Sequence, residues 1–180
     1  MADPAVTDGR YHVVGGIGTW YASSQEQAAW AELFRHFLGE GVDPFEIRRR
    51  VGHVEVDRLV VLDLTDAAVR SALGVTETDL VSDDYAVTQR IAKAAASAGF
   101  EGILAPSAAL PGRTTLVVFS AGMRAVAPGI SRVRQPPSRM ADLLRVIRPH
   151  PDMPGSVRQR LRSRGASGSQ LLRRERRRRS

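Results

Sequence analysis

The chain contains no cysteine, a single lysine and no long apolar run. Without thiols it cannot form disulfides, use a thiolate nucleophile or build a cysteine-based zinc site. The longest unbroken apolar stretches, residues 59–62 and 116–119, are far shorter than the roughly 20 residues that cross a bilayer. The first residues also lack the basic start and apolar run of a secretory signal. These absences predict a cytoplasmic protein without a membrane anchor.

Metal ligands are sparse as well. The four histidines, His12, His36, His53 and His150, are far apart in the sequence, and no two of them have the spacing of a ligand pair. We therefore expect no dedicated metal site.

The net charge of +7 is unevenly distributed along the chain. Residues 1–119 carry 10 basic and 16 acidic side chains, whereas residues 158–180 carry ten arginines and one glutamate. The acidic balance of the first part argues against a body that binds nucleic acid. The arginine-rich tail could do so by itself, because several arginines together give a salt-dependent affinity for phosphates.

The hydrophobic periodicity predicts a mixed α/β domain. Glycines at 15, 16 and 18 form a loop before the first strand, and Ser23 with Glu26 has the spacing of a capping box for the first helix. The apolar face of this helix is expected to contain five side chains at helical spacing: Ala29, Leu33, Phe37, Trp30 and Phe34. We expect strands at 19–22, 54–64, 102–105 and 114–119, and helices from 23 to about 38, from 66 to about 74, at 83–98 behind a Ser82 cap, and at 139–147.

Composition also predicts the domain organisation. Residues 1–157 form one domain with its core at about 9–120 and a proline-rich extension at 121–157. Residues 158–180 have almost no large apolar side chains and are expected to be a disordered basic tail.

Three short segments contain side chains suited to binding or catalysis. Arg10, in Gly9-Arg10-Tyr11-His12, could grip a phosphate or carboxylate, or could be an ordinary surface arginine. Glu32 lies at the edge of the apolar face of the first helix, either in solvent or half-buried at a site. Ser107 follows a predicted strand, at a binding edge or in a simple turn. Taken singly, each segment leaves both interpretations open.

Together and in this order the segments resemble the RES domain, a family named for Arg, Glu and Ser. The resemblance rests on Gly9-Arg10-Tyr11-His12, on Thr19-Trp20-Tyr21-Ala22-Ser23-Ser24 continuing to Glu32, and on residues 62–65 and 99–107. It covers about residues 9–120. It implies a compact fold related to ADP-ribosyltransferase toxins and an enzyme that cleaves the nicotinamide–ribose bond of NAD, with water or inorganic phosphate as the acceptor.

The resemblance also implies roles for five residues. Arg10 is expected to hold the NAD pyrophosphate, and Glu32 to stabilise the positive charge that develops on the ribose. Tyr11 and Tyr21 are expected to pack on the nicotinamide or its ribose. Ser107 is expected to donate a hydrogen bond to the substrate and to hold Arg10 or Glu32 in place, without acting as a nucleophile.

Finally, the resemblance implies a toxin that is paired with an Xre-type helix-turn-helix antitoxin and forms an oligomer in that complex. NAD is the substrate, phosphate is a possible co-substrate, and no cofactor is expected. Two alternatives stay open. Only nine residues precede Arg10, where family members commonly have a first strand, so the fold could be kept with weakened activity. The chain could also be a nucleic-acid-binding protein that acts through its tail.

Overall fold

The computed structural model describes residues 7–39, 48–134 and 147–148, and confirms the expected mixed α/β fold class. Within these residues the strands are β1 (Thr19–Ser23), β2 (Arg49–Val56), β3 (Val61–Asp63), β4 (Gly102–Pro106), β5 (Thr114–Phe119) and β6 (Val126–Arg134). The helices are α1 (Glu26–Gly39), α2 (Ala67–Ala72), α3 (Glu77–Val81), α4 (Ala86–Ser97) and the 3₁₀ segment η2 (Ser120–Ala125).

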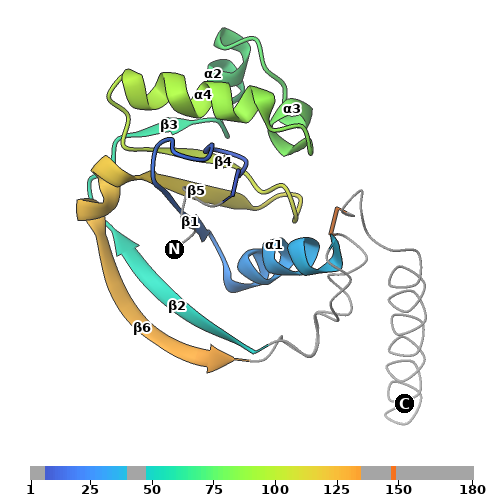
Figure 1. Ribbon diagram of the computed structural model, residues 1–180, viewed down its shortest axis with the longest axis vertical. Coiled ribbons are helices and arrows are strands. Elements are labelled where there is room, and N and C mark those ends of the chain that lie inside the picture. Colours follow the sequence, from blue (N-terminus) through green and yellow to red (C-terminus); the bar gives the residue numbers. More distant parts are fainter. Residues whose placement is uncertain (1–6, 40–47, 135–146, 149–180) are drawn as a thin grey trace, which may run out of the picture.

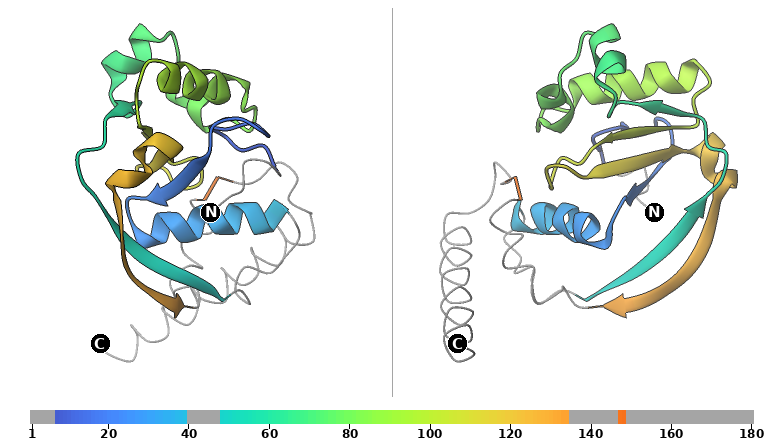
Figure 2. Two further views of the ribbon diagram at one scale, coloured as in Figure 1. Left: turned by 60° about the vertical axis from the view of Figure 1, so that its left-hand side comes forward. Right: turned by 180° about the vertical axis from the view of Figure 1, so that it is seen from behind.

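The strands form two separate sheets. The main sheet has the order β1-β5-β4-β3, in which β4 pairs with β3 in parallel and the other neighbours are antiparallel. Strands β2 and β6 form an antiparallel pair of their own. Helices α2, α3 and α4 lie on one side of the main sheet, whereas α1 lies on the other side, next to the curved β2–β6 arm (Figure 1; Figure 2). The sheet is therefore a middle layer between helices.

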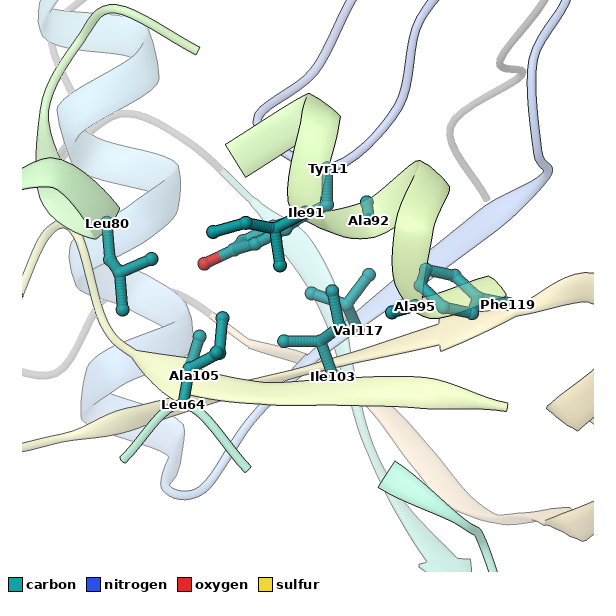
Figure 3. Close-up of a cluster of buried hydrophobic side chains, with 10 residues drawn as sticks. All are labelled: Tyr11, Leu64, Leu80, Ile91, Ala92, Ala95, Ile103, Ala105, Val117 and Phe119. Carbon is teal, nitrogen blue, oxygen red and sulfur yellow. The ribbon is translucent and has the colours of Figure 1, made fainter. Parts of the chain in front are cut away.

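Each face of the main sheet has its own apolar cluster. The first fills the space between the sheet and α4 and contains Tyr11, Leu64, Leu80, Ile91, Ala92, Ala95, Ile103, Ala105, Val117 and Phe119 (Figure 3). The second joins α1 to the β4–β5 loop and contains Ala28, Trp30, Ala31, Phe34, Ala109, Leu110 and Ile147. Burial of these side chains fixes α1 and the β4–β5 loop against each other. Both elements contribute residues to the site described below.

The expected strand at 54–64 is wrong, because that segment is divided between two sheets. Residues up to Val56 belong to β2, and the chain then turns at Arg58, whose φ of 54° lies in the left-handed region. Val61 begins β3 in the main sheet. A single non-glycine residue with positive φ is uncommon, and the apolar pattern on both sides of it predicts one continuous strand.

Two expected helix starts are also wrong. Ser23 is the last residue of β1 and α1 begins at Glu26, so these two residues do not form the predicted capping box. Helix α4 begins at Ala86 and not at Asp83, with no side-chain cap. The short helix α3 precedes it and has a complete capping box, formed by Thr76 and Asp79. Of the two residues that could cap α2, Thr65 and Asp66, the structure shows Asp66 as the cap, with its side chain accepting from Ala68 N.

Trp30 and Phe34 of α1 are buried as predicted, but the rest of the buried face differs from the predicted one. Ala28, Ala31 and Phe34 are fully buried, whereas Ala29 is exposed and Leu33 is half-buried. Both Ala29 and Leu33 line the cleft described below. Ala29 and Leu33 therefore form part of the cleft wall. The small side chains of Ala28 and Ala31 allow close packing behind that wall.

The remaining expectations fall mostly outside the described residues. These include the tail at 158–180 and the helix at 139–147, of which only Ile147 is described, buried in the second cluster. In the part of the chain that the structure describes, no helix is long and apolar enough to cross a membrane.

Candidate active site

The site begins at a tight turn made by Gly9-Arg10-Tyr11-His12. The backbones of Gly9 and His12 bond to each other in both directions, at 3.0 and 3.3 Å. A Cβ on residue 9 would lie 2.2 Å from Cε1 of the His12 ring, so only glycine fits at this position. From α4, Gln89 Nε2 donates to the carbonyl oxygens of Gly9 and His12 at 3.0 and 3.3 Å. The turn is thus attached to α4, and its three side chains point in defined directions.

Arg10 is held by the segment between α3 and α4. Its Nη1 donates to the carbonyl oxygens of Leu80, at 3.1 Å, and of Ser82. Its guanidinium lies over the ring of Tyr85, 4.8 Å from the centroid. The side chain is 11 % exposed, so it is not an ordinary surface arginine. These contacts fix the Nη1 edge of the guanidinium, whereas Nη2 takes no part in either hydrogen bond.

Tyr21, on β1, joins the turn to the main sheet. Its hydroxyl accepts from Tyr11 N at 3.2 Å and lies 2.9 Å from His12 Nδ1. Thr19 Oγ1 lies 2.8 Å from the same ring nitrogen. Burial raises the pKa of the Tyr21 hydroxyl above its usual value, so this group stays protonated at neutral pH.

Tyr11 is 2 % exposed, and its hydroxyl has no hydrogen-bond partner among the described residues. Figure 3 shows its ring in the first apolar cluster beneath α4, with the hydroxyl directed toward the Leu80 side. Burial is also the main cause that raises the pKa of Tyr11. A buried hydroxyl without a partner is costly, and such groups often serve a ligand.

Glu32, on α1, is oriented by the β4–β5 loop. Ser107 Oγ donates to Glu32 Oε1 at 2.7 Å, and Ala109 N donates to the same oxygen at 3.1 Å. Ser107 is 1 % exposed, and its Oγ accepts from Leu110 N at 3.0 Å. Since all the hydrogen bonds to Glu32 from described residues go to Oε1, the other oxygen is available to a ligand.

These residues surround a cleft of about 1010 Å³. Arg10, Tyr11, Tyr21 and Glu32 line it, and Ser107 lies directly behind Glu32. The opposite wall is formed by residues 49–54 of β2. The structure thus brings together the five residues that the sequence singles out. The alternatives of a solvated Glu32 and a simple turn at Ser107 do not fit a carboxylate held by two donors.

Sequence reasoning missed Arg35, which also lines the cleft. It lies three residues after Glu32, and therefore on the same side of α1, and its side chain is 7 % exposed. Its Nη2 donates to Asp83 Oδ1, and the same oxygen lies 4.0 Å from Arg10 Nη2. The i, i+3 spacing from Glu32 was the signal available in the sequence. Asp83 was misassigned to the first turn of a helix.

Among residues 7–39, 48–134 and 147–148, no group of three or more His, Asp or Glu side chains is arranged to hold a metal ion. The described site offers a positioned carboxylate, a buried and a half-buried tyrosine, and two arginines. Such a set can bind an anionic substrate and stabilise a positive charge next to the carboxylate.

Comparison with known proteins identifies the family to which the chain is similar. The model of the RES domain family matches residues 1–152. A probable NAD(+) phosphorylase of Mycobacterium tuberculosis is 59 % identical over 98 % of this chain and 84 % of its own length. The NAD(+) phosphorylase MbcT of Mycobacterium bovis is 32 % identical over 64 % of this chain and 61 % of its own. The crystal structure of the M. tuberculosis MbcT–MbcA toxin–antitoxin complex superposes with a TM-score of 0.64 at 26 % identity, covering 77 % of this chain and 75 % of that one.

Proposed function

Because the chain belongs to the RES domain family, we propose that it is an NAD phosphorylase that uses the cleft between α1, the Gly9–His12 turn and β2. The observation that carries the proposal is the clamped carboxylate of Glu32 in a cleft that is also lined by Arg10, Tyr11 and Tyr21. The names of two relatives, both NAD(+) phosphorylases, support phosphate as the acceptor.

The proposed reaction transfers ADP-ribose from nicotinamide to phosphate. The bond between the ribose carbon and the nicotinamide nitrogen breaks, and its electron pair leaves with the now neutral nicotinamide. A phosphate oxygen forms the new bond to the same carbon, which gives free nicotinamide and ADP-ribose 1″-phosphate. An anionic phosphate oxygen can attack without a general base, so the enzyme must mainly position the reactants and stabilise the cationic ribose.

Each residue has a task in this scheme. The free oxygen of Glu32 faces the ribose and stabilises its positive charge, while Ser107 and Ala109 prevent the carboxylate from rotating away. Arg10 binds the pyrophosphate of NAD, with its orientation set by Leu80 and Ser82. The hydroxyl of Tyr11 completes its hydrogen bonding with the substrate, and Tyr21 packs against the nicotinamide end.

The test is to incubate the purified full chain with NAD, with and without inorganic phosphate, and to separate the products by chromatography. We expect nicotinamide and ADP-ribose 1″-phosphate in equal amounts, and release that depends on phosphate. Glu32→Gln keeps the shape of the side chain and should remove most of the activity, whereas Glu55→Gln, an exposed carboxylate on β2, is the matched control. Full nicotinamide release by Glu32→Gln would refute the proposal, and release of free ADP-ribose alone would replace phosphorolysis by hydrolysis.

We also propose that the protein acts in the cytoplasm as a toxin that an Xre-type antitoxin neutralises, with residues 1–157 as the toxic domain. The structural match to a protein solved with its antitoxin supports this context. Expression of the chain alone in a bacterial host should lower total NAD and arrest growth, and expression of Glu32→Gln should do neither. Unchanged NAD during expression of the wild-type chain would argue instead for a weakened member of the family.

A further inference from the structure

The two buried arginines of the cleft share one carboxylate, and the sharing is unequal. Asp83 Oδ1 accepts a hydrogen bond from Arg35 Nη2, but it lies 4.0 Å from Arg10 Nη2, beyond hydrogen-bond range. The two guanidinium groups come from α1 and from the Gly9–His12 turn, which are far apart in the sequence. One oxygen thus lies between two cations and satisfies only one of them.

Both arginines are short of hydrogen-bond acceptors. Arg10 uses Nη1 for the carbonyls of Leu80 and Ser82, and its Nη2 has no hydrogen-bond acceptor among the described residues, with Asp83 Oδ1 4.0 Å away. The Nε of Arg35 is buried and has no partner within the described part of the chain. The side chains of Arg10 and Arg35 are only 11 % and 7 % exposed, and the buried Nε of Arg35 is compensated neither by a described residue nor by contact with solvent.

Asp83 is much less fixed than the two arginines that it faces. Its side chain is 36 % exposed, and it lies between the end of α3 at Val81 and the start of α4 at Ala86. Asp83 belongs to neither helix, so its carboxylate can turn toward solvent without breaking a regular element.

We propose that the position of the Asp83 carboxylate is a phosphate subsite, bounded by Arg10 and Arg35, that Asp83 occupies until a substrate phosphate displaces it. A phosphate group has more oxygens than a carboxylate and more negative charge, so it can bond both guanidinium groups at once. Arg35 is then a substrate-binding residue. Asp83 acts as an internal competitor that keeps two like charges paired in the empty enzyme. The subsite deepens the proposed NAD phosphorolysis and rests on it for the identity of the phosphate, which belongs either to the pyrophosphate of NAD or to the inorganic co-substrate.

The two sources are separated by steady-state kinetics of Asp83→Asn, which keeps the shape of the side chain and removes its charge. If the subsite takes the co-substrate, KM for inorganic phosphate falls by about tenfold and KM for NAD stays unchanged; if it takes the pyrophosphate, the reverse holds. Arg35→Lys should raise the same KM, because lysine keeps the charge but loses the fork. Asp84→Asn is the matched control, since the neighbouring Asp84 binds Ala86 N and neither arginine.

A binding measurement keeps this proposal separate from the reaction itself. Inorganic phosphate and pyrophosphate should each be tested for the rise in Tm that they cause in the purified full chain. The anion that the subsite accepts should raise the Tm of Asp83→Asn by more than that of the wild type or of Asp84→Asn. This result can be obtained even if the chain fails to cleave NAD. Equal Tm shifts in all three proteins, together with unchanged KM values, would overturn the subsite and leave Asp83 as a structural partner of Arg35.

Discussion

Replacing Ser107 with alanine should separate the orientation of Glu32 from its charge. The Ser107 hydroxyl donates to Glu32 Oε1 at 2.7 Å and accepts from Leu110 N at 3.0 Å, in a position that is 1 % exposed. A hydrogen bond to a charged group contributes about 1.5–3 kcal/mol. If most of this stabilisation is needed to hold the carboxylate against the transition state, kcat falls by about 10- to 100-fold. Ala109 N still binds Glu32, so the loss should be smaller than in Glu32→Gln.

The same change has a cost in stability. Leu110 N loses its acceptor in a buried position, which lowers the free energy of unfolding by about 1–3 kcal/mol. In a chain of this size, that corresponds to a Tm lower by roughly 2–10 °C. The kinetic assay should therefore be run at 25 °C, with folding checked by circular dichroism.

The informative readout is the division between kcat and KM. Ser107 lies behind Glu32 and acts through it, so we expect kcat for nicotinamide release to fall while KM for NAD changes by less than about threefold. Ser120→Ala is the control, because this exposed hydroxyl donates to Gly18 O and does not line the cleft. A folded Ser107→Ala protein with wild-type kcat would refute the argument that this hydrogen bond orients Glu32.

The remaining predictions concern the turn, the tyrosines and the tail. Tyr11→Phe removes a buried hydroxyl that has no partner, so thermal unfolding should show a gain of about 1 kcal/mol while KM for NAD rises; a lower Tm would contradict this. Burial raises the pKa of Tyr11 and Tyr21, so their contribution to stability is complete below about pH 10 and is lost as the pH rises further, because the unfolded chain ionises first. Urea midpoints between pH 8 and 11 should decline at the alkaline end, and less steeply in Tyr11→Phe. Gly9→Ala forces a Cβ into the His12 ring and should cost about 1–3 kcal/mol together with most NAD turnover, whereas unchanged urea midpoints would show that the turn tolerates a side chain. Deleting residues 158–180 should leave NAD turnover intact and remove any salt-dependent binding to DNA; lost turnover would assign the tail to the site.

Prediction from the sequence was most successful for strands whose apolar pattern reflects burial in the main sheet alone. Strands β1, β4 and β5 follow from alternating or continuous apolar residues between turn signals. The break between β2 and β3 at Arg58 could not be predicted in this way, because nothing in the arginine side chain indicates a positive φ. Tertiary pairing of β2 with β6 imposes this break. Asp83 was predicted wrongly because an aspartate suits the start of a helix, whereas in the structure its carboxylate pairs with Arg35, 48 residues away.

The candidate site could likewise be predicted only in part from the sequence. Arg10, Glu32 and Ser107 could be singled out because the order of their motifs resembles a family. Their motifs do not show how these residues contact one another. The hydrogen bond between Ser107 Oγ and Glu32, for example, joins residues 75 apart and depends on packing of the β4–β5 loop against α1. Arg35 belongs to none of these motifs; its i, i+3 spacing from Glu32 was the signal available in the sequence, and its contact with Asp83 is seen only in the three-dimensional structure.

The order of pairing in the main sheet has a consequence for synthesis of the protein. Strand β1 pairs with β5, which is made some ninety residues later, and the donors to Glu32 lie just before β5. A nascent chain on the ribosome therefore contains Arg10, Tyr21 and Glu32 long before it contains the loop that orients the carboxylate. Such non-local contacts close late in folding. The NAD-cleaving activity that we propose should therefore appear only after β5 has left the exit tunnel, and a message cut short before that point should yield a fragment without this activity.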